Sequence, residues 1–182
     1  MKTNKIIIGL VGEIASGKGT VAKYLEEKHH ATSHRFSTPL RDVLKRLHME
    51  INRKNMQDIS TLLREYFGQN MLAKVISEDV QKDENQIMVV DGIRRLADIE
   101  YLKSLPEFKL IYITADIKTR YERLIKRGEN EDDLSKTFEQ FQLDHQKETE
   151  LEIPLVAEQA NIKIDNSNGL DKLYDQIEKL LN

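Results

Sequence analysis

Short apolar runs alternate with longer amphipathic stretches along this chain. The runs are rich in isoleucine and valine and are bounded by polar or turn residues, as buried parallel strands are. They are KIIIGLV (5–11), a weaker SHRF (33–36), QIMVVD (86–91), FKLIYIT (108–114) and NIKID (161–165). With right-handed crossover helices between them, this order predicts a three-layer α/β fold with a mainly five-stranded parallel sheet.

The stretches between these runs have the spacing of amphipathic helices. Thr38 and Pro39 predict an N-cap followed by proline at the first helical position, and Asp116 predicts the N-cap of a later helix. Four apolar stripes have helical spacing: Leu40, Val43, Leu44 and Leu47; Ile59, Leu62, Leu63 and Tyr66; Leu72, Val75, Ile76 and Val80; and Ile117, Tyr121, Leu124 and Ile125.

This pattern contains no internal repeat and no linker. We therefore expect a single domain over residues 1–182. Its core would comprise 1–36, 85–127 and 150–182, with a helical insertion at 37–84 and a short lid region at 128–149.

Composition narrows the class of protein without identifying a partner. The net charge of −3 gives no support to a general nucleic-acid or anionic-membrane surface, because those require a basic excess. The absence of cysteine excludes disulfides, thiolate chemistry and a cysteine zinc site. No apolar run approaches the ~18 residues of a membrane span, so we expect a cytoplasmic protein. The oligomeric state is left open.

The segment GEIASGKGT (12–20) follows the first apolar run and fits G-x-x-x-x-G-K. Glycines let backbone N–H groups wrap a phosphate, and a helix starting near Gly17 points its positive end at the same anion. Lys18 supplies charge for the β- and γ-phosphates. Gly19 separates Lys18 from the hydroxyl of Thr20, so either Thr20 or water would complete a Mg²⁺ shell. A ligand-free glycine turn is the alternative.

The form SGKGT resembles the P-loop of the adenylate kinase family and its nucleoside monophosphate kinase relatives. The resemblance implies ATP binding by the whole loop: Gly12, Glu13, Ile14, Ala15, Ser16, Gly17, Lys18, Gly19 and Thr20.

A second motif supports the first. Asp91 ends an apolar run beside the P-loop, where a carboxylate can hold Mg²⁺ directly or through water. DGIRR (91–95) resembles the D-G-x-x-R segment of the same family, which implies that Asp91 and either Arg94 or Arg95 bind the acceptor's phosphate. The alternative is a capping aspartate followed by surface arginines.

The insertion and the lid carry further arginines. HRFSTPLRDVL (34–44) resembles the start of the family's monophosphate-binding segment, which implies Ser37 and Arg41 as acceptor contacts. Arg64 lies off the apolar stripe of its helix and is a third candidate, although a solvated arginine is the alternative at each position.

Arg120, Arg123 and Arg127 share one predicted helix face. Cations gathered in this way repel unless an anion or acidic partners offset them, and phosphoryl transfer supplies such an anion. Pairing with Glu122 or with the acidic run 129–133 is the alternative. A resemblance to the lid arm of nucleoside monophosphate kinases implies that Arg123 and Arg127 are catalytic and that Arg123 also binds ATP.

The final segment IKIDNSNGLDKL (162–173) resembles the last strand and turn of the family. The resemblance implies that the chain runs past the adenine of ATP at Asn166 and Gly169, although the same residues also make an ordinary turn.

The combined expectation is a kinase that transfers the γ-phosphoryl group of ATP, with Mg²⁺, to a nucleoside or deoxynucleoside monophosphate. Its partner would be this small-molecule acceptor, with no nucleic acid and no membrane. One alternative is dephospho-coenzyme A kinase, which resembles the chain at AEQANIKIDN (157–166) but needs a carboxylate base that HRFSTPL does not supply. The other is a nucleotide-binding regulator without transfer activity. The base of the acceptor is left open.

Overall fold

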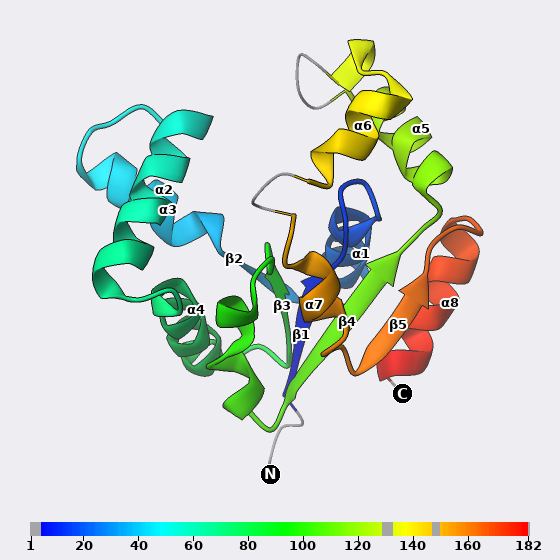
Figure 1. The fold of residues 1–182 in the computed structure, drawn as a ribbon. Helices are drawn as coiled ribbons and strands as arrows, with labels where there is room; N and C mark the ends of the chain where they lie inside the picture. Colours follow the sequence, from blue (N-terminus) through cyan, green and yellow to red (C-terminus); the bar gives the residue numbers. More distant parts are fainter. Residues whose placement is uncertain (1–4, 129–132, 147–149, 182) are drawn as a thin grey trace.

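The computed structural model describes residues 5–128, 133–146 and 150–181, which fold around a parallel sheet (Figure 1). The strands pair in the order β2-β3-β1-β4-β5, and each neighbouring pair is parallel. The predicted five-stranded parallel sheet is therefore confirmed, including the weak run at 33–36. The strands are β1 (Ile6–Val11), β2 (Thr32–Arg35), β3 (Ile87–Asp91), β4 (Phe108–Thr114) and β5 (Ile162–Asp165).

The helices connect these strands and form the two outer layers. The α-helices are α1 (Lys18–His29), α2 (Ser37–Arg46), α3 (Arg53–Phe67), α4 (Met71–Lys82), α5 (Ile117–Arg127), α6 (Phe138–Asp144), α7 (Ile153–Ala157) and α8 (Leu170–Leu181). Short 3-10 helices occur at η1 (Leu96–Ile99), η2 (Leu102–Ser104) and η3 (Asp133–Ser135). None of the helices described is long and apolar enough to cross a membrane.

The predicted start of α2 is wrong by two residues. The helix begins at Ser37 and its N-cap is Phe36, so Thr38 lies inside the first turn. Pro39 is tolerated at the third helical position because the N–H groups of the first turn have no acceptor within the helix. The predicted N-cap at Asp116 is confirmed by position.

The strands bury both faces, which explains why their sequences are apolar throughout rather than alternating. In β1, Ile7 and Val11 pack into one core, whereas Ile8 and Leu10 pack into the other. The first core is completed by α4, α7 and the start of α2, and the second by α1 and α8. This confirms the three-layer arrangement.

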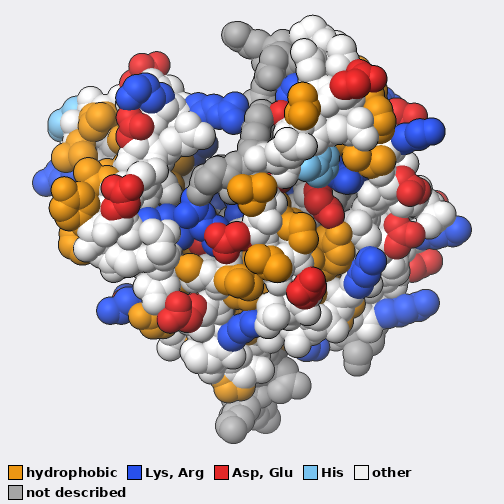
Figure 2. Space-filling view, viewed as in Figure 1, with side chains coloured by type: hydrophobic (Ala, Val, Ile, Leu, Met, Phe, Trp, Pro, Cys, Tyr) orange, Lys and Arg blue, Asp and Glu red, His pale blue; other side chains and the backbone are white. Residues whose placement is uncertain are grey.

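Two helical arms rise beyond the carboxyl ends of the strands (Figure 1). One arm contains α2 and α3, and the other contains α5 and α6. Figure 2 shows that the surface is hollowed between them and that Lys and Arg side chains gather along the hollow. Because β1 and β3 are parallel neighbours, the P-loop after β1 and Asp91 at the end of β3 meet at the base of this hollow.

Candidate functional site

The P-loop requires glycine at two positions for different reasons. Gly17 is the N-cap of α1 with a φ of 109°, a conformation that favours glycine, and a Cβ there would lie 2.1 Å from Asn166 Nδ2. At Gly12 a Cβ would lie 2.2 Å from the carbonyl oxygen of Ile113. The loop is thus packed closely against β4 and against the turn that follows β5. The predicted helix start near Gly17 is confirmed.

Lys18 is folded back onto the loop that carries it. Its Nζ donates to the carbonyl oxygens of Gly12, at 2.5 Å, and Glu13, at 3.1 Å. Burial lowers the pKa of Lys18, while the carboxylates of Asp91 and Glu150 act in the opposite direction. The ammonium group is therefore held by two carbonyl oxygens of the loop, at the position that the motif predicts.

Asp91 offers carboxylate oxygens of the kind that Mg²⁺ prefers. Asp91 Oδ1 accepts the N–H of Gly92 at 2.8 Å, and Oδ2 lies 3.9 Å from Arg35 Nε. Among the described residues, no three His, Asp or Glu side chains cluster into a complete metal site. Mg²⁺ commonly takes only one or two protein oxygens and obtains the rest from phosphate and water. Asp91 and Thr20 would hold Mg²⁺ in this way.

Glu150 is a residue of the site that the sequence pattern did not reveal. Its side chain is 7% exposed, and Oε1 lies 3.1 Å from Arg94 Nη1. Burial raises the pKa of Glu150, and Arg94 and Lys18 oppose that rise. Glu150 thus forms an ion pair with the DGIRR arginine, and the charge of the P-loop lysine also influences its pKa. No spacing marks Glu150, because several acidic residues precede Pro154 and only the fold selects this one.

The Glu150→Gln variant should gain stability relative to the unsubstituted protein as pH rises from about 4 to about 7. The raised pKa of Glu150 means that the folded protein binds this proton more tightly than the unfolded chain does. The resulting stability is complete below the ordinary value of 4.5 and is lost as pH rises through the folded-state pKa. Glutamine cannot ionise and avoids that loss. Urea unfolding across this range measures the difference, and a constant difference would contradict the expectation.

Arg64 forms a buried ion pair instead of being a solvated side chain, and its predicted contact with the acceptor stays a prediction. Its Nη2 lies 2.8 Å from Asp98 Oδ1, and both side chains are buried. Leu62 and Tyr66, which were expected in the apolar stripe of α3, are 47% and 79% exposed. The packed face is instead Met56, Ile59 and Leu63, with the ion-paired Arg64 beside them.

Asp98 connects this ion pair to the DGIRR segment. Its Oδ2 accepts the backbone N–H groups of Arg94, at 2.9 Å, and Arg95, at 3.0 Å. Arg64 therefore supports the DGIRR segment, which we call the clamp segment, through Asp98. Asp98 follows Asp91 by seven residues. The only sequence signal for its role is that the backbone N–H groups of the turn after β3 need an acceptor nearby.

The remaining acceptor candidates have different surroundings. The Nη1 of Arg95 donates to Gln69 Oε1 at 3.3 Å. Ser37 begins α2, and Arg41 is exposed one turn later. The structure thus brings Arg94 to the buried carboxylate near Lys18, while acceptor contacts by Ser37, Arg41 and Arg95 stay predictions.

Of the three arginines predicted to share one face of α5, Arg120 is satisfied by contacts within the protein. Arg120 is buried: its Nε donates to the carbonyl oxygen of Ala115 at 3.0 Å, and Nη1 lies 2.7 Å from His145 Nε2. Its guanidinium also lies over the Phe141 ring, 5.8 Å from the centroid. Arg120 therefore holds the lid helix α6 against α5.

Arg123 and Arg127 have different surroundings. Arg123 is half-buried and its Nη2 donates to the carbonyl oxygen of Asn166 at 2.7 Å, whereas Arg127 is exposed at the end of α5. Gly169, with a φ of 91°, precedes α8. The catalytic roles of Arg123 and Arg127, and the contacts of Arg123 and Gly169 with ATP, stay predictions. The acidic run at 129–133 falls mostly outside the described residues.

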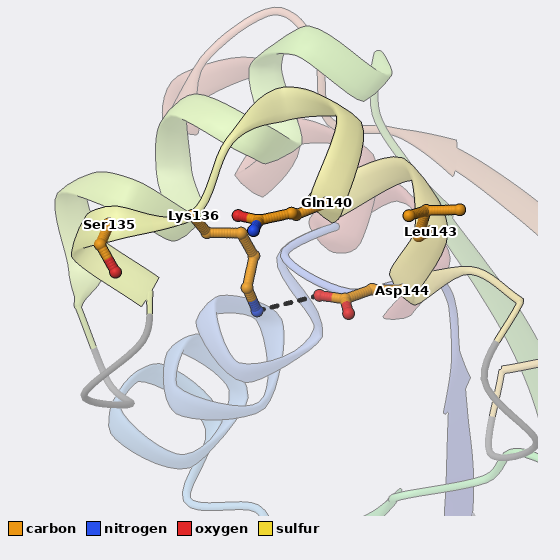
Figure 3. Close-up of a pocket in the computed structure, with 5 residues that line it drawn as sticks. All are labelled: Ser135, Lys136, Gln140, Leu143 and Asp144. Carbon is orange, nitrogen blue, oxygen red and sulfur yellow. Dashed lines mark hydrogen bonds and ion pairs between the residues drawn. The ribbon is translucent and has the colours of Figure 1, made fainter.

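The lid carries a pocket of its own, shown in Figure 3. It has a volume of about 380 Å³, and its wall contains an ion pair of 2.9 Å between Lys136 Nζ and Asp144 Oδ2. The lining residues are Ser135, Lys136, Gln140, Leu143 and Asp144. All belong to the lid and none is a predicted site residue, so this pocket is separate from the P-loop site.

Comparison with known proteins agrees with this geometry. Residues 8–149 match the AAA domain family. A UPF0200 protein of Sulfurisphaera tokodaii is 30% identical over 177 residues, which cover 96% of this chain and 95% of the relative. A UPF0200 protein of Thermococcus kodakarensis is 27% identical over 181 residues, with 97% and 96% covered.

Solved structures share the fold. A shikimate kinase from Acinetobacter baumannii, solved with shikimate, has a TM-score of 0.57 at 16% identity, covering 98% of this chain and 92% of that one. A shikimate kinase from Bacteroides thetaiotaomicron has a TM-score of 0.54 at 16% identity, covering 96% and 95%. The expected P-loop kinase-like fold is thus confirmed, whereas the specific resemblance to nucleoside monophosphate kinases stays a prediction. The chain belongs to the AAA domain family and to the UPF0200 proteins.

Proposed function

We propose that this protein is an ATP-dependent kinase that transfers the γ-phosphoryl group to the phosphate of a nucleoside or deoxynucleoside monophosphate. The observation that carries the proposal is the 3.1 Å ion pair of Arg94 with the buried Glu150, whose pKa also responds to the charge of Lys18. The two cations come from different strand ends, yet both act on one anionic group. A donor phosphate on Lys18 and an acceptor phosphate on Arg94 would be neighbours in such a site.

The other residues take roles consistent with this arrangement. The P-loop would cradle the ATP phosphates, with Lys18 on the transferred group. Asp91 and Thr20 would hold Mg²⁺, which offsets phosphate charge. Arg123 and Arg127 would stabilise charge that develops in the transition state. An acceptor phosphate is already ionised, so this reaction needs no general base.

One observation favours a hydroxyl acceptor instead, as dephospho-coenzyme A kinase would require. Glu13 Oε1 accepts a hydrogen bond from the Tyr112 hydroxyl at 2.5 Å, while Oε2 is buried and has no hydrogen-bond partner in the described part of the chain. A carboxylate held this way beside Lys18 could take the proton of an attacking hydroxyl. Glu13→Gln would then abolish turnover, whereas a phosphate acceptor would tolerate it.

ADP formation with ATP, Mg²⁺ and a panel of acceptors tests the proposal. The panel contains AMP, CMP, UMP, GMP, their deoxy forms, dTMP and dephospho-coenzyme A. We expect turnover with one or more of the monophosphates. Turnover with dephospho-coenzyme A alone would establish the hydroxyl acceptor. ATP binding without stimulation by any acceptor would favour a nucleotide-binding regulator.

Arg94→Ala should raise the KM for the acceptor by about 10- to 100-fold, because a charge-assisted contact to phosphate is lost. The KM for ATP should change little, since Arg94 lies beyond the P-loop. Steady-state kinetics with each substrate varied in turn measures both constants. Arg46→Ala, an exposed arginine at the end of α2, is the matched control. An unchanged acceptor KM in Arg94→Ala would show that Arg94 does not bind the acceptor phosphate.

A further inference from the structure

The turn after β5 meets the P-loop through one buried side chain, that of Asn166. Asn166 is 2% exposed, and its Nδ2 donates to the carbonyl oxygen of Ser16 at 2.8 Å. Ser16 is fully buried, and 150 residues separate it from Asn166 along the chain. A buried carbonyl without a donor is costly, so this bond has a clear reason to persist.

The backbone of Asn166 is fixed from two other directions. Its N–H donates to the carbonyl oxygen of Thr114 at the end of β4, at 2.8 Å. Its own carbonyl oxygen accepts from Arg123 Nη2 at 2.7 Å. Asn166 therefore joins the sheet, helix α5 and the P-loop. A residue held on three sides can fix the position of whatever its side chain touches.

The consequence for the P-loop follows from peptide geometry. The described chain contains no cis peptide, so the carbonyl of Ser16 and the N–H of Gly17 point in opposite directions from one peptide plane. Asn166 holds that carbonyl, which directs the Gly17 N–H away from Asn166. The close approach at Gly17, where a Cβ would lie 2.1 Å from Asn166 Nδ2, leaves this peptide little room to rotate.

Several polar atoms around this bond have no hydrogen-bond partner among the residues that the structure describes. They are Ser16 Oγ, Asn166 Oδ1 and Arg123 Nη1, all buried. Native proteins rarely leave such atoms unpaired, and where they occur they commonly mark a functional site. Their gathering at the P-loop indicates an arrangement built for a ligand rather than for packing alone.

We infer that Asn166 is a positioning residue that orients the Ser16–Gly17 peptide so that the Gly17 N–H faces a bound phosphate. The inference rests on the proposed function only in taking the P-loop as the nucleotide phosphate site. It differs from the expectation that Asn166 passes the adenine, because its side chain serves the phosphates. It also gives a reason why Arg123 and the P-loop both form hydrogen bonds with Asn166.

Binding of MgATP and of magnesium tripolyphosphate to the whole protein, measured by calorimetry, separates these roles. Tripolyphosphate has phosphates but no base. Asn166→Ala and the isosteric Asn166→Asp should weaken both ligands alike, by about 10- to 100-fold. Asn166→Asp keeps the backbone bonds but replaces the donor with an oxygen that repels the Ser16 carbonyl, so it tests the amide even where alanine prevents folding. Gln176→Ala, which loses bonds to the opposite side of the same turn, should bind both ligands normally.

Each outcome decides the inference. Weaker ATP binding with unchanged tripolyphosphate binding would make Asn166 a base contact and overturn it. Unchanged binding of both ligands by folded variants would show a packing role and overturn it as well. If the unsubstituted protein binds neither ligand, the proposed function fails together with the inference. If it binds both but transfers to no acceptor, only the proposed kinase reaction fails.

Discussion

Lys18→Ala should lower kcat/KM for phosphoryl transfer by about 10³-fold or more while leaving the fold intact. The expected loss reflects electrostatic stabilisation of charge on the transferred group, which in preorganised sites contributes about 10²–10³ per donor and more for a full charge. Lys18 is well placed for this because it is buried, which removes competing water, and because its Nζ is held on the loop by the carbonyl oxygens of Gly12 and Glu13.

Single-turnover kinetics with saturating ATP would measure this loss, since it separates the chemical step from product release. Lys23→Ala is the matched control: it removes a lysine from the same helix, but one that is exposed and paired with Glu27. A Lys18→Ala variant with kcat within about threefold of the unsubstituted protein would exclude the P-loop as the site of transfer. Retained ATP binding with lost turnover is the expected combination.

Local pattern was sufficient for most of the fold. Strands buried on both faces must be apolar along their length, so β1, β3 and β4 stand out from the polar residues around them. Even β2 was predicted, from the weak run SHRF (33–36), although the observed strand, Thr32–Arg35, begins and ends one residue earlier. The start of α2 was less predictable, because proline fits several positions in a first helical turn and Pro39 alone cannot choose between them.

The candidate site was predictable only where a motif consists of neighbouring residues. The P-loop and Asp91-Gly92 are motifs of this kind, and the structure places both at one edge of the sheet. Glu150 and Asp98 act through contacts across the fold, with Arg94 and Arg64 respectively, and no spacing in the chain encodes such pairings. Arg64 shows the reverse problem. Its position off the apolar stripe suggests a solvated or ligand-binding side chain, but it forms a buried ion pair with Asp98.

Arg64→Ala should destabilise the folded protein by about 3–5 kcal/mol, because it leaves the buried carboxylate of Asp98 without its cation. Urea unfolding measures this loss. Lys54→Ala is the control on the same helix, since the Lys54–Asp58 pair is exposed and its removal should cost less than about 1 kcal/mol.

Further measurements decide whether Arg64 supports the DGIRR segment through Asp98 or binds the acceptor. If Arg64 only supports the clamp, Arg64→Ala combined with Asp98→Asn should recover part of the lost stability, because the uncompensated charge is gone. The amide of asparagine can still accept a backbone N–H of Arg94 or Arg95 through its oxygen, so the clamp segment keeps part of its support. A stable Arg64→Ala protein with a large rise in acceptor KM would instead return Arg64 to the acceptor site and make its pairing with Asp98 incidental.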